Sequence, residues 1–468
     1  MQLTYLAHAS LLVEEDGVRL VTDPWLDGPT YLGAWWHFPA PAARGAELAG
    51  VDWVYLTHEH VDHFHEPTLA CLPRSTPILI GRFMTSRFRD QLRALGFADV
   101  RELPHGEEVA LSPSLHVTSY QYRADDTALV VRGRDGTVLD LNDSLTRDRS
   151  LAQILDRHPR IDLLAASFAN AEAYPIVYDF GDPAERVDWD DASRFDGFLE
   201  KVRQIAPAAF APFASMFCFL DEELFALNDR IVTPAPLVAR ARAGEVHAAA
   251  LPLDPGDRWS PARGHEVERP VDWARKDALL VEYAARAAPE LARRRAAARV
   301  PGGRAALADA FAARFRGFLH RVPWPVRRAL DVSIRFDVTG DAAQLLWLRF
   351  GGGRLELAAP ARDDAWDVKI TVPGWALHRV LAGRDTWQTL GISCRFRVAL
   401  RPHVRERELL FWTLLYLDDL GYLTLGPLLS PRALGVVARR HREVREYARG
   451  LLGGRFVQQS LRDKFAVK

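Results

Sequence analysis

The sequence predicts a protein of the α/β class that begins with an αββα sandwich, in which two mixed sheets lie between outer helices. Three observations lead to this prediction. Short apolar strands alternate with turns and helices over residues 1–260, helical spacing rich in Arg, Ala and Glu follows, and strand-type segments return from residue 330. A chain of 468 residues also exceeds one ordinary domain. We therefore predict a sandwich over 1–260, a helical linker over 261–329, and a smaller α/β unit with a helical tail over 330–468.

The strands expected in the sandwich are short apolar or alternating runs bounded by turn residues. They cover residues 3–5, 10–13, 19–22, 51–57, 78–80, 115–122, 127–131, 138–141, 162–166 and 210–213. Apolar residues at helical spacing predict helices over 84–95 and 195–205. This mixture of strands and helices predicts two mixed sheets with helices outside.

The second unit is expected to contain four strands followed by helices. The strands cover residues 332–338, 344–350, 354–358 and 366–371, and the helices cover 374–382, 386–390 and a tail from 406. The most apolar stretch, residues 409–429, contains Asp418 and Asp419, which predicts a buried helix rather than a membrane span.

The composition excludes several classes of protein. A formal net charge of −1 gives no overall attraction to nucleic acid or to an anionic membrane. The cysteines Cys71, Cys218 and Cys394 are far apart, so we expect buried thiols rather than disulfides, a structural zinc site or an iron–sulfur cluster. The N-terminus shows no signal peptide, and we predict a cytoplasmic protein.

The segment Thr-His-Glu-His-Val-Asp-His at 57–63 is the strongest feature of the chain. His58, His60, Asp62 and His63 follow directly on an apolar strand, and a strand end can hold converging ligands rigidly. Two histidines two residues apart can bind one metal ion, and Asp62 with His63 can bind a second. Four such side chains in six residues are difficult to explain as packing. A solvated polar loop is the alternative.

Two acidic residues are candidates for support of these ligands. A metal-bound imidazole usually donates its other N–H to an acceptor, and Glu59 or Asp23 can serve. Capping of a turn is the alternative role for Asp23, and Glu59 and His65 can also be solvent-exposed.

The histidine segment resembles the metallo-β-lactamase superfamily. The opening stretches Leu-Ala-His-Ala-Ser at 6–10, Asp-Pro-Trp-Leu-Asp-Gly-Pro at 23–29 and Trp-Trp at 35–36 are similar to the metal-binding half of CMP-N-acetylneuraminate hydroxylases. Further similar stretches lie at 126–131, 139–143, 167–170 with 174–175, and 211–214. The resemblance covers roughly residues 1–260 and extends to UlaG-like hydrolases and to di-iron hydroxylases of natural-product pathways that share this fold.

The resemblance implies three further metal ligands. Asp143 corresponds to a carboxylate that bridges two metals, with a turn residue as its alternative. Where hydrolases of this fold place two more histidines, this chain has carboxylates, which we assign to Asp126 and Asp221, with Asp125 and Glu222 as the neighbouring alternatives. Asp126 and Asp143 are also the predicted catalytic residues.

The carboxylate-rich donor set favours iron, because hard anionic ligands suit it. We therefore predict a di-iron oxygenase that hydroxylates or otherwise oxidises a small molecule in a biosynthetic pathway, with dioxygen as co-substrate. The alternative enzyme is a UlaG-like binuclear hydrolase with zinc or manganese, which attacks a phosphodiester, lactone or amide. A binding module with a degenerate metal site is the third hypothesis.

Aromatic segments supply the expected substrate contacts. Trp36, Tyr122 and Tyr174 are the predicted substrate-binding residues, although all three can equally belong to the core. An oxygenase of this composition needs an external electron donor, since the chain has neither a nucleotide fingerprint nor iron–sulfur ligands. The C-terminal unit faintly resembles sterol-carrier-like domains. Covering an apolar ligand, forming a homodimer and supporting the sandwich are its candidate roles.

Overall fold

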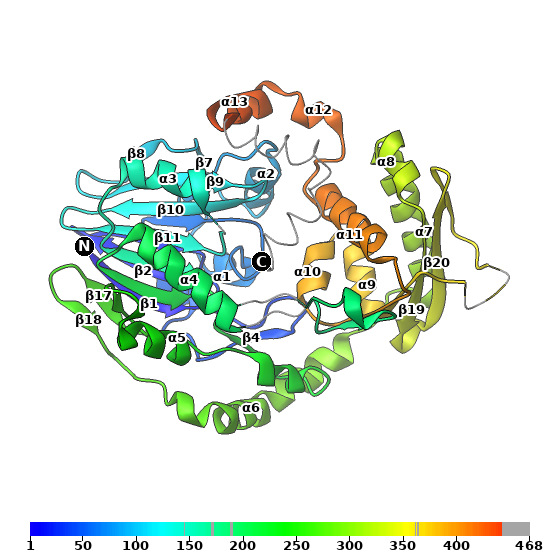
Figure 1. The fold of residues 1–468 in the computed structure, drawn as a ribbon, viewed down its shortest axis with the longest axis horizontal. Helices are drawn as coiled ribbons and strands as arrows, with labels where there is room; N and C mark the ends of the chain where they lie inside the picture. The colour runs from blue at the N-terminus through cyan, green and yellow to red at the C-terminus, as the bar shows by residue number, and fades with distance from the viewer. Residues whose placement is uncertain (145, 170–172, 188–190, 361, 363–364, 442–468) are drawn as a thin grey trace.

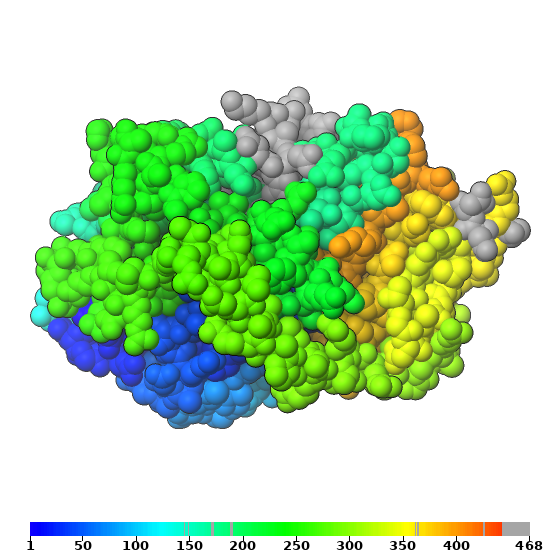
Figure 2. Space-filling model, turned by 90° about the horizontal axis from the view of Figure 1, so that it is seen from below, coloured from blue at the N-terminus to red at the C-terminus, as the bar shows by residue number. Residues whose placement is uncertain are grey.

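The computed structural model contains three sheets of six or more strands, arranged in two parts (Figure 1). It describes residues 1–468 except 145, 170–172, 188–190, 361, 363–364 and 442–468. Two sheets form the sandwich near the N-terminus, and the third belongs to the C-terminal part. Figure 2 shows the middle of the chain lying across both parts.

The first sheet of the sandwich has eight strands in the order β18-β17-β1-β2-β3-β5-β6-β7. These strands are β1 (Gln2–Ala7), β2 (Ser10–Glu15), β3 (Val18–Thr22), β5 (Trp53–Leu56), β6 (Ile78–Gly81), β7 (Val100–Leu103), β17 (Arg258–Ser260) and β18 (Gly264–Glu266). β1, β2 and β3 pair antiparallel, whereas β3, β5, β6 and β7 pair parallel. The parallel strands end at one edge of the sheet, and the histidine segment follows β5 at that edge.

The second sheet has seven strands in the order β16-β14-β12-β11-β10-β9-β8. They are β8 (Glu108–Ala110), β9 (His116–Tyr122), β10 (Asp126–Arg132), β11 (Thr137–Asn142), β12 (Leu163–Ser167), β14 (Ala209–Phe213) and β16 (Ala249–Ala250). Leu3 and Tyr5 on β1 pack against Leu129 and Val131 on β10 in the space between the sheets. The sequence prediction of an αββα sandwich is confirmed.

Helices cover the outer faces of the sandwich. α1 (Glu66–Ala70) and α2 (Arg87–Ala94) pack on the first sheet. α3 (Asp148–Arg157), α4 (Asp191–Ile205) and α5 (Ala235–Arg240) pack on the second. Alternation along β11 is clear, since Leu139 and Leu141 face these helices while Asp140 between them faces the interior.

A small two-stranded sheet joins the aromatic opening stretch to the end of the second sheet. β4 (Trp35–His37) pairs antiparallel with β15 (Phe217–Phe219). Trp35 stacks on Phe217 with ring centroids 3.6 Å apart. These rings belong to the core cluster of the C-terminal part, so this region is shared by both parts.

The third sheet has six strands in the order β13-β23-β22-β19-β20-β21. They are β13 (Tyr178–Phe180), β19 (Val332–Thr339), β20 (Gln344–Gly351), β21 (Arg354–Glu356), β22 (Val368–Pro373) and β23 (Arg397–Leu400). Alternate residues of β19 and β22 are buried under a helical layer. The helices of this part are α7 (Gly303–Arg321), α8 (Trp324–Ala329), α9 (Gly374–Leu381), α10 (Trp387–Ile392), α11 (Arg405–Asp419), α12 (Leu425–Leu428) and α13 (Pro431–Arg439).

The long helix α6 (Lys276–Ala297) connects the two parts and packs on Trp36 and Phe38. The structure places three segments differently from the predicted boundaries. β18 extends the first sheet beyond residue 260, α7 packs on the third sheet through Phe311 and Phe315, and β13 leaves the sandwich segment to pair with β23. Strand pairing decides the placement of β18 and β13, and apolar packing decides that of α7. Local sequence patterns report neither kind of long-range contact.

Two smaller expectations can also be compared with the structure. Cys218 and Cys394 are buried, but Cys71 at the end of α1 is exposed, so the expectation of a buried thiol is wrong there. The apolar stretch at 409–429 is divided between α11 and α12. None of the described helices combines the length and the apolar character that a membrane crossing requires.

Candidate metal centre

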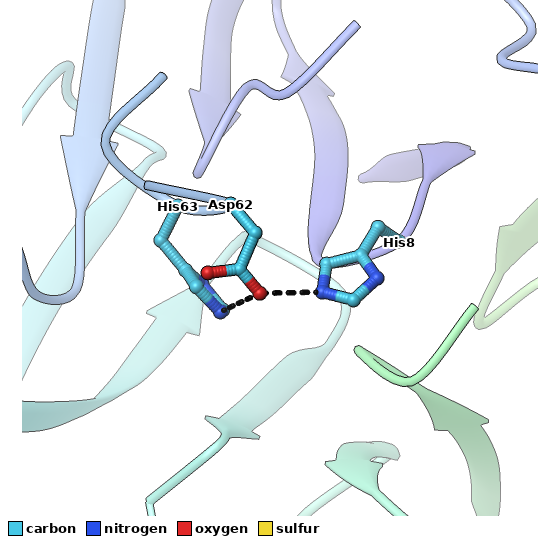
Figure 3. Close-up of side chains that lie close together, drawn as sticks. All are labelled: His8, Asp62 and His63. Atoms are coloured by element: carbon cyan, nitrogen blue, oxygen red, sulfur yellow. Dashed lines mark hydrogen bonds and ion pairs between the residues drawn. The ribbon is translucent and has the colours of Figure 1, made fainter. Parts of the chain in front are cut away.

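The histidine segment begins directly after β5, and its side chains meet residues from the ends of several other strands. Two groups of ligand-type atoms result. His8, Asp62 and His63 form the first, and His58, His60 and Asp143 form the second. The first group is fully buried, whereas His60 and Asp143 in the second are partly exposed. The first group is drawn in Figure 3.

Asp143 lies between the two groups. It follows β11 and belongs to the second group, and its Oδ2 is also 3.4 Å from Nε2 of His63 in the first. Its side chain is 31% exposed, so this carboxylate lies on the open side of the centre. The position is the one that a carboxylate bridging two metal ions would need.

Asp126 lies beside the second group at the start of β10. Its Oδ1 accepts from the backbone N–H of Thr127 and is 3.6 Å from Nδ1 of His58, the ring nitrogen that also faces Thr57, so Asp126 lies outside both ligand groups. Burial, and then the negative charges of Asp125 and Asp143, raise the pKa of Asp126 well above its usual value. A cation placed among these carboxylates would relieve that repulsion.

Asp221, the other predicted carboxylate ligand, is not brought to either group. It forms an ion pair with Arg395 from the C-terminal part. The neighbouring Glu222 is exposed. The structure therefore places Asp126 and Asp143 near the histidines and Asp221 elsewhere.

Asp23 supports the centre by hydrogen bonds to His63 and to residues beside the ligands. This fully buried residue directly follows β3, has a left-handed backbone (φ 40°), and its carboxylate accepts four hydrogen bonds. The donors are the backbone N–H and hydroxyl of Thr57, the Nδ2 amide of Asn142, and Nδ1 of His63 at 3.0 Å. Since Nδ1 of His63 donates its proton to Asp23, Nε2 is left as the metal-binding atom.

Thr57 orients His58 in the same manner. Its hydroxyl donates to Asp23 and lies 2.9 Å from Nδ1 of His58, from which it can accept. Burial, together with the neighbouring His63 and His60, lowers the pKa of His58 well below its usual value. A neutral imidazole is the form that binds a metal.

Within the part of the chain that the structure describes, two buried ring nitrogens of the centre have no hydrogen-bond partner, so the residues present fit metal ions. Nε2 of His58 faces Nδ1 of His60 at 2.7 Å, and Nε2 of His63 and of His60 are buried without a hydrogen-bond partner among the described residues. Buried nitrogens are rarely left without a partner in proteins. Inward-facing nitrogens and carboxylates in one place are the donor set that a pair of metal ions would satisfy.

Glu59 points away from this centre. Its carboxylate forms a 2.6 Å ion pair with Arg87 on α2, and burial raises its pKa to about 7. Its neighbour His65 is buried and caps the N-terminus of α1 by accepting from Thr68. Among the described residues, the hydrogen bonds and ion pairs of these two side chains are made outside both ligand groups.

The three predicted substrate-binding aromatics are all buried. Trp36 packs against α6, and the guanidinium of Arg405 lies 4.2 Å from the ring centroid of Tyr174. Tyr122 ends β9, opposite Asp126. Tyr122 is therefore the one of the three whose strand neighbour is a predicted ligand.

Sequence reasoning missed two residues of the centre, His8 and Tyr31. His8 lies in the turn between β1 and β2, and the Tyr31 hydroxyl donates a 2.5 Å hydrogen bond to Oδ1 of Asp62. His8 lies in one of the stretches that carried the family resemblance, residues 6–10, and Tyr31 lies two residues after another, residues 23–29. A histidine in the tight turn of a buried hairpin was the feature that could have identified His8.

Comparison with known families agrees with this geometry. Residues 2–134 match the beta-lactamase superfamily domain. The sandwich thus has the metallo-β-lactamase fold. A protein of Mycolicibacterium smegmatis described as a Rieske 2Fe-2S iron-sulfur protein is 26% identical over 430 residues, which cover 85% of this chain and 81% of the relative.

Cytidine monophosphate-N-acetylneuraminic acid hydroxylase of Mus musculus is 28% identical over 233 residues, covering 46% of this chain and 39% of the hydroxylase. The chain therefore matches well under half of the hydroxylase's length. Among solved structures, an isothiocyanate hydrolase from Delia radicum gut bacteria gives a TM-score of 0.41 at 17% identity, over 56% of this chain and 98% of the hydrolase. The resemblance to the hydroxylases predicted from the opening stretches is confirmed.

Proposed function

We propose that this metallo-β-lactamase-fold protein is a di-iron oxygenase that hydroxylates or otherwise oxidises a small molecule. The observation that carries the proposal is the position of Asp143 between two ligand groups, with Asp126 beside His58 where hydrolases of the fold use an imidazole. His58, His60, Asp126 and Asp143 would hold one iron, and Asp62, His63 and Asp143 the other. Two irons so held supply the activation of dioxygen.

The protein's own residues position the ligands and control access to the centre. Asp23 and Thr57 fix the imidazole rings, and the Tyr31 hydroxyl binds the Asp62 oxygen that faces away from His63 and His8. Burial of the first group excludes water on that side. The exposed edge at His60 and Asp143 is therefore the side from which we propose that substrate approaches.

The names of the sequence relatives support oxidation chemistry. One relative is called a hydroxylase and another a Rieske iron-sulfur protein. This chain carries only Cys71, Cys218 and Cys394 as thiols, so we propose that an external donor supplies the electrons.

A binuclear hydrolase is the second candidate, and one observation favours it. His8 brings a fourth imidazole to the centre, next to His58, His60 and His63. Imidazole-rich sites suit zinc, whose bound hydroxide is the nucleophile in hydrolases. The carboxylates Asp126 and Asp143 at the open side favour iron instead.

Metal analysis of protein purified without added metal separates the two candidates. The oxygenase proposal expects two irons per chain and dioxygen consumption when a chemical reductant is supplied. A stoichiometric pair of zinc ions without dioxygen-dependent turnover would contradict it. Replacement of His60 by Ala should remove metal under either candidate, with Arg87→Ala on α2 as the control, because Arg87 contacts Glu59 but no ligand.

A further inference from the structure

The segment that follows β14 does not bring its predicted ligand, Asp221, to the metal centre, because Asp221 pairs with Arg395. The same segment binds the β1–β2 turn instead. The backbone N–H of Ala214 donates to the carbonyl of His8, and the carbonyl of Met216 lies 3.4 Å from Nδ1 of the His8 ring.

The His8 ring is directed at the first ligand group. Its Nε2 lies 3.0 Å from Oδ2 of Asp62, and Nε2 of His63 lies 3.4 Å from the same oxygen (Figure 3). Three ligand atoms, two imidazole nitrogens and one carboxylate oxygen, thus converge in a buried space. Together with Asp143, this makes a four-ligand set of the kind that transition metals accept.

The two ring nitrogens of His8 face different partners. Nδ1 faces the carbonyl of Met216, which can only accept, and Nε2 lies 3.0 Å from a carboxylate oxygen of Asp62. With Nδ1 turned to that carbonyl, Nε2 is the ring atom placed to bind a cation shared with the carboxylate. His63 has the same arrangement, with Nδ1 against Asp23 and Nε2 facing the carboxylates.

The surrounding structure holds His8 in this orientation. The side chain is 1% exposed, and its ring packs edge-on against Trp25, Trp35 and Phe217. The backbone at His8 is left-handed (φ 43°), which is unfavourable for a residue with a side chain. Such strain in an aromatic enclosure is typical of a residue held for a functional reason.

We infer that His8 is a direct ligand of the metal ion held by Asp62 and His63, and that it supplies from the N-terminal turn the ligand that was predicted at Asp221. The inference rests on the proposed two-metal centre. It assigns to the Leu-Ala-His-Ala-Ser stretch a chemical role and not only a structural one. It also places one ligand about fifty positions before the histidine segment, brought close to it by the pairing of β2 with β3 and of β3 with β5.

The test measures metal stoichiometry and affinity in the full chain. Wild-type protein should bind two equivalents of cobalt(II), measured by metal analysis and by competition with a chelator. His8→Ala should lose one equivalent, or bind the second at least about 100-fold more weakly, which is at or above the effect of removing a residue that only supports a ligand. His65→Gln is the matched control, because His65 is a buried imidazole near the histidine segment that lies in neither ligand group.

A second variant distinguishes a ligand from a residue that only hydrogen-bonds to Asp62. His8→Cys places a thiolate at the same position, and its cobalt(II) form should show a sulfur-to-cobalt charge-transfer band that wild type lacks. Absence of that band in folded His8→Cys protein overturns the inference. So does wild-type affinity for two equivalents in His8→Ala.

The outcomes also separate this inference from the proposed function. Wild-type protein that binds no metal would refute the two-metal centre itself, and the inference with it. Two equivalents in wild type and in His8→Ala would refute the role of His8 alone. Circular dichroism of the metal-free variants identifies any that fail to fold. If His8→Ala does not fold, the charge-transfer band of His8→Cys decides whether His8 is a ligand.

Discussion

The sandwich and the C-terminal part contact the same loops of the candidate metal centre, but by different means. In the sandwich, Asp23 gathers Thr57, Asn142 and His63 through short bonds between fully buried groups. The C-terminal part shares an apolar cluster with the aromatic residues of these loops, and it adds polar contacts from the ends of long side chains. Arg395 donates to the carbonyl of Leu32, and Tyr416 donates to Asp125. The contrast indicates that the sandwich fixes the ligands, whereas the C-terminal part holds the loops around them.

The largest effect on stability and metal binding is expected for Asp23, the buried acceptor inside the sandwich. Asp23→Ala removes the acceptor of four buried hydrogen bonds, so we expect the free energy of unfolding to fall by about 3–5 kcal/mol and the metal to be lost. Denaturant unfolding and metal analysis measure the two effects. Asp52→Ala, at an exposed aspartate in the loop before β5, is the control. Retention of both metals would show that Asp23 does not orient the ligands.

Arg395→Ala should have a smaller effect that separates stability from metal binding. The variant leaves Asp221 without its cation and frees the carbonyl of Leu32, so we expect a loss of about 2 kcal/mol in unfolding free energy. Metal content should not change, because Asp221 lies in neither ligand group. Arg384→Ala, an exposed arginine of the same part, is the control. Loss of metal in Arg395→Ala but not in Arg384→Ala would break the comparison.

A pH-dependent contribution is expected from Asp419 at the end of α11. Burial raises its pKa to about 6, above the ordinary 3.8, while it accepts from the backbone N–H of Trp387 and pairs with Arg314. Because the folded-state pKa is raised, its stabilising contribution is complete below pH 4 and is lost as the pH rises through 6. Asp419→Asn should therefore unfold with a free energy about 1 kcal/mol higher than wild type at pH 7, after solvent screening, and about equal at pH 4. If Asp419→Asn and wild type had equal free energies of unfolding at pH 7 as well as at pH 4, the raised pKa of Asp419 would be contradicted.

The smallest effect is expected for Tyr416→Phe. The variant loses one hydrogen bond to Asp125, worth about 0.5–1 kcal/mol, and should increase amide hydrogen exchange in residues 122–126 without altering the metal content. Tyr422, which donates to the carbonyl of Ala124, contacts the same turn. A double variant with Tyr422→Phe should increase exchange further. Unchanged exchange in the double variant would show that the C-terminal part does not restrain this turn.

Much of the centre could be predicted because its ligands are close together in the sequence. His58, His60, Asp62 and His63 occupy one loop, and the strand before them was evident from its apolar run. Asp23 was proposed as support because it ends a strand, and the structure places its carboxylate against His63. Local patterns were sufficient for these residues, since one turn or one strand end determines each position.

The remaining residues of the centre depend on contacts that span long stretches of sequence. His8 reaches Asp62 through the pairing order of the first sheet, which residue patterns do not encode. The register after β14 was uncertain, and Asp221 was assigned as a ligand although the structure pairs it with Arg395 from a distant strand end. The aromatic residues were ambiguous because packing around a site and lining a site require the same side chains. For Trp36 and Tyr174 the structure shows contacts with α6 and Arg405.

The strand β13 has a consequence for how the protein is made. Its residues lie within the sandwich segment, yet they pair with β23, and the Tyr178 hydroxyl donates to Glu408, 230 residues further along the chain. During synthesis this edge strand leaves the ribosome long before its partner exists. The third sheet can therefore close only after nearly the whole chain has emerged. No single cut between the two parts would give two fragments that each retain all their strands, so fragments meant to fold alone should carry residues 178–180 with the C-terminal part.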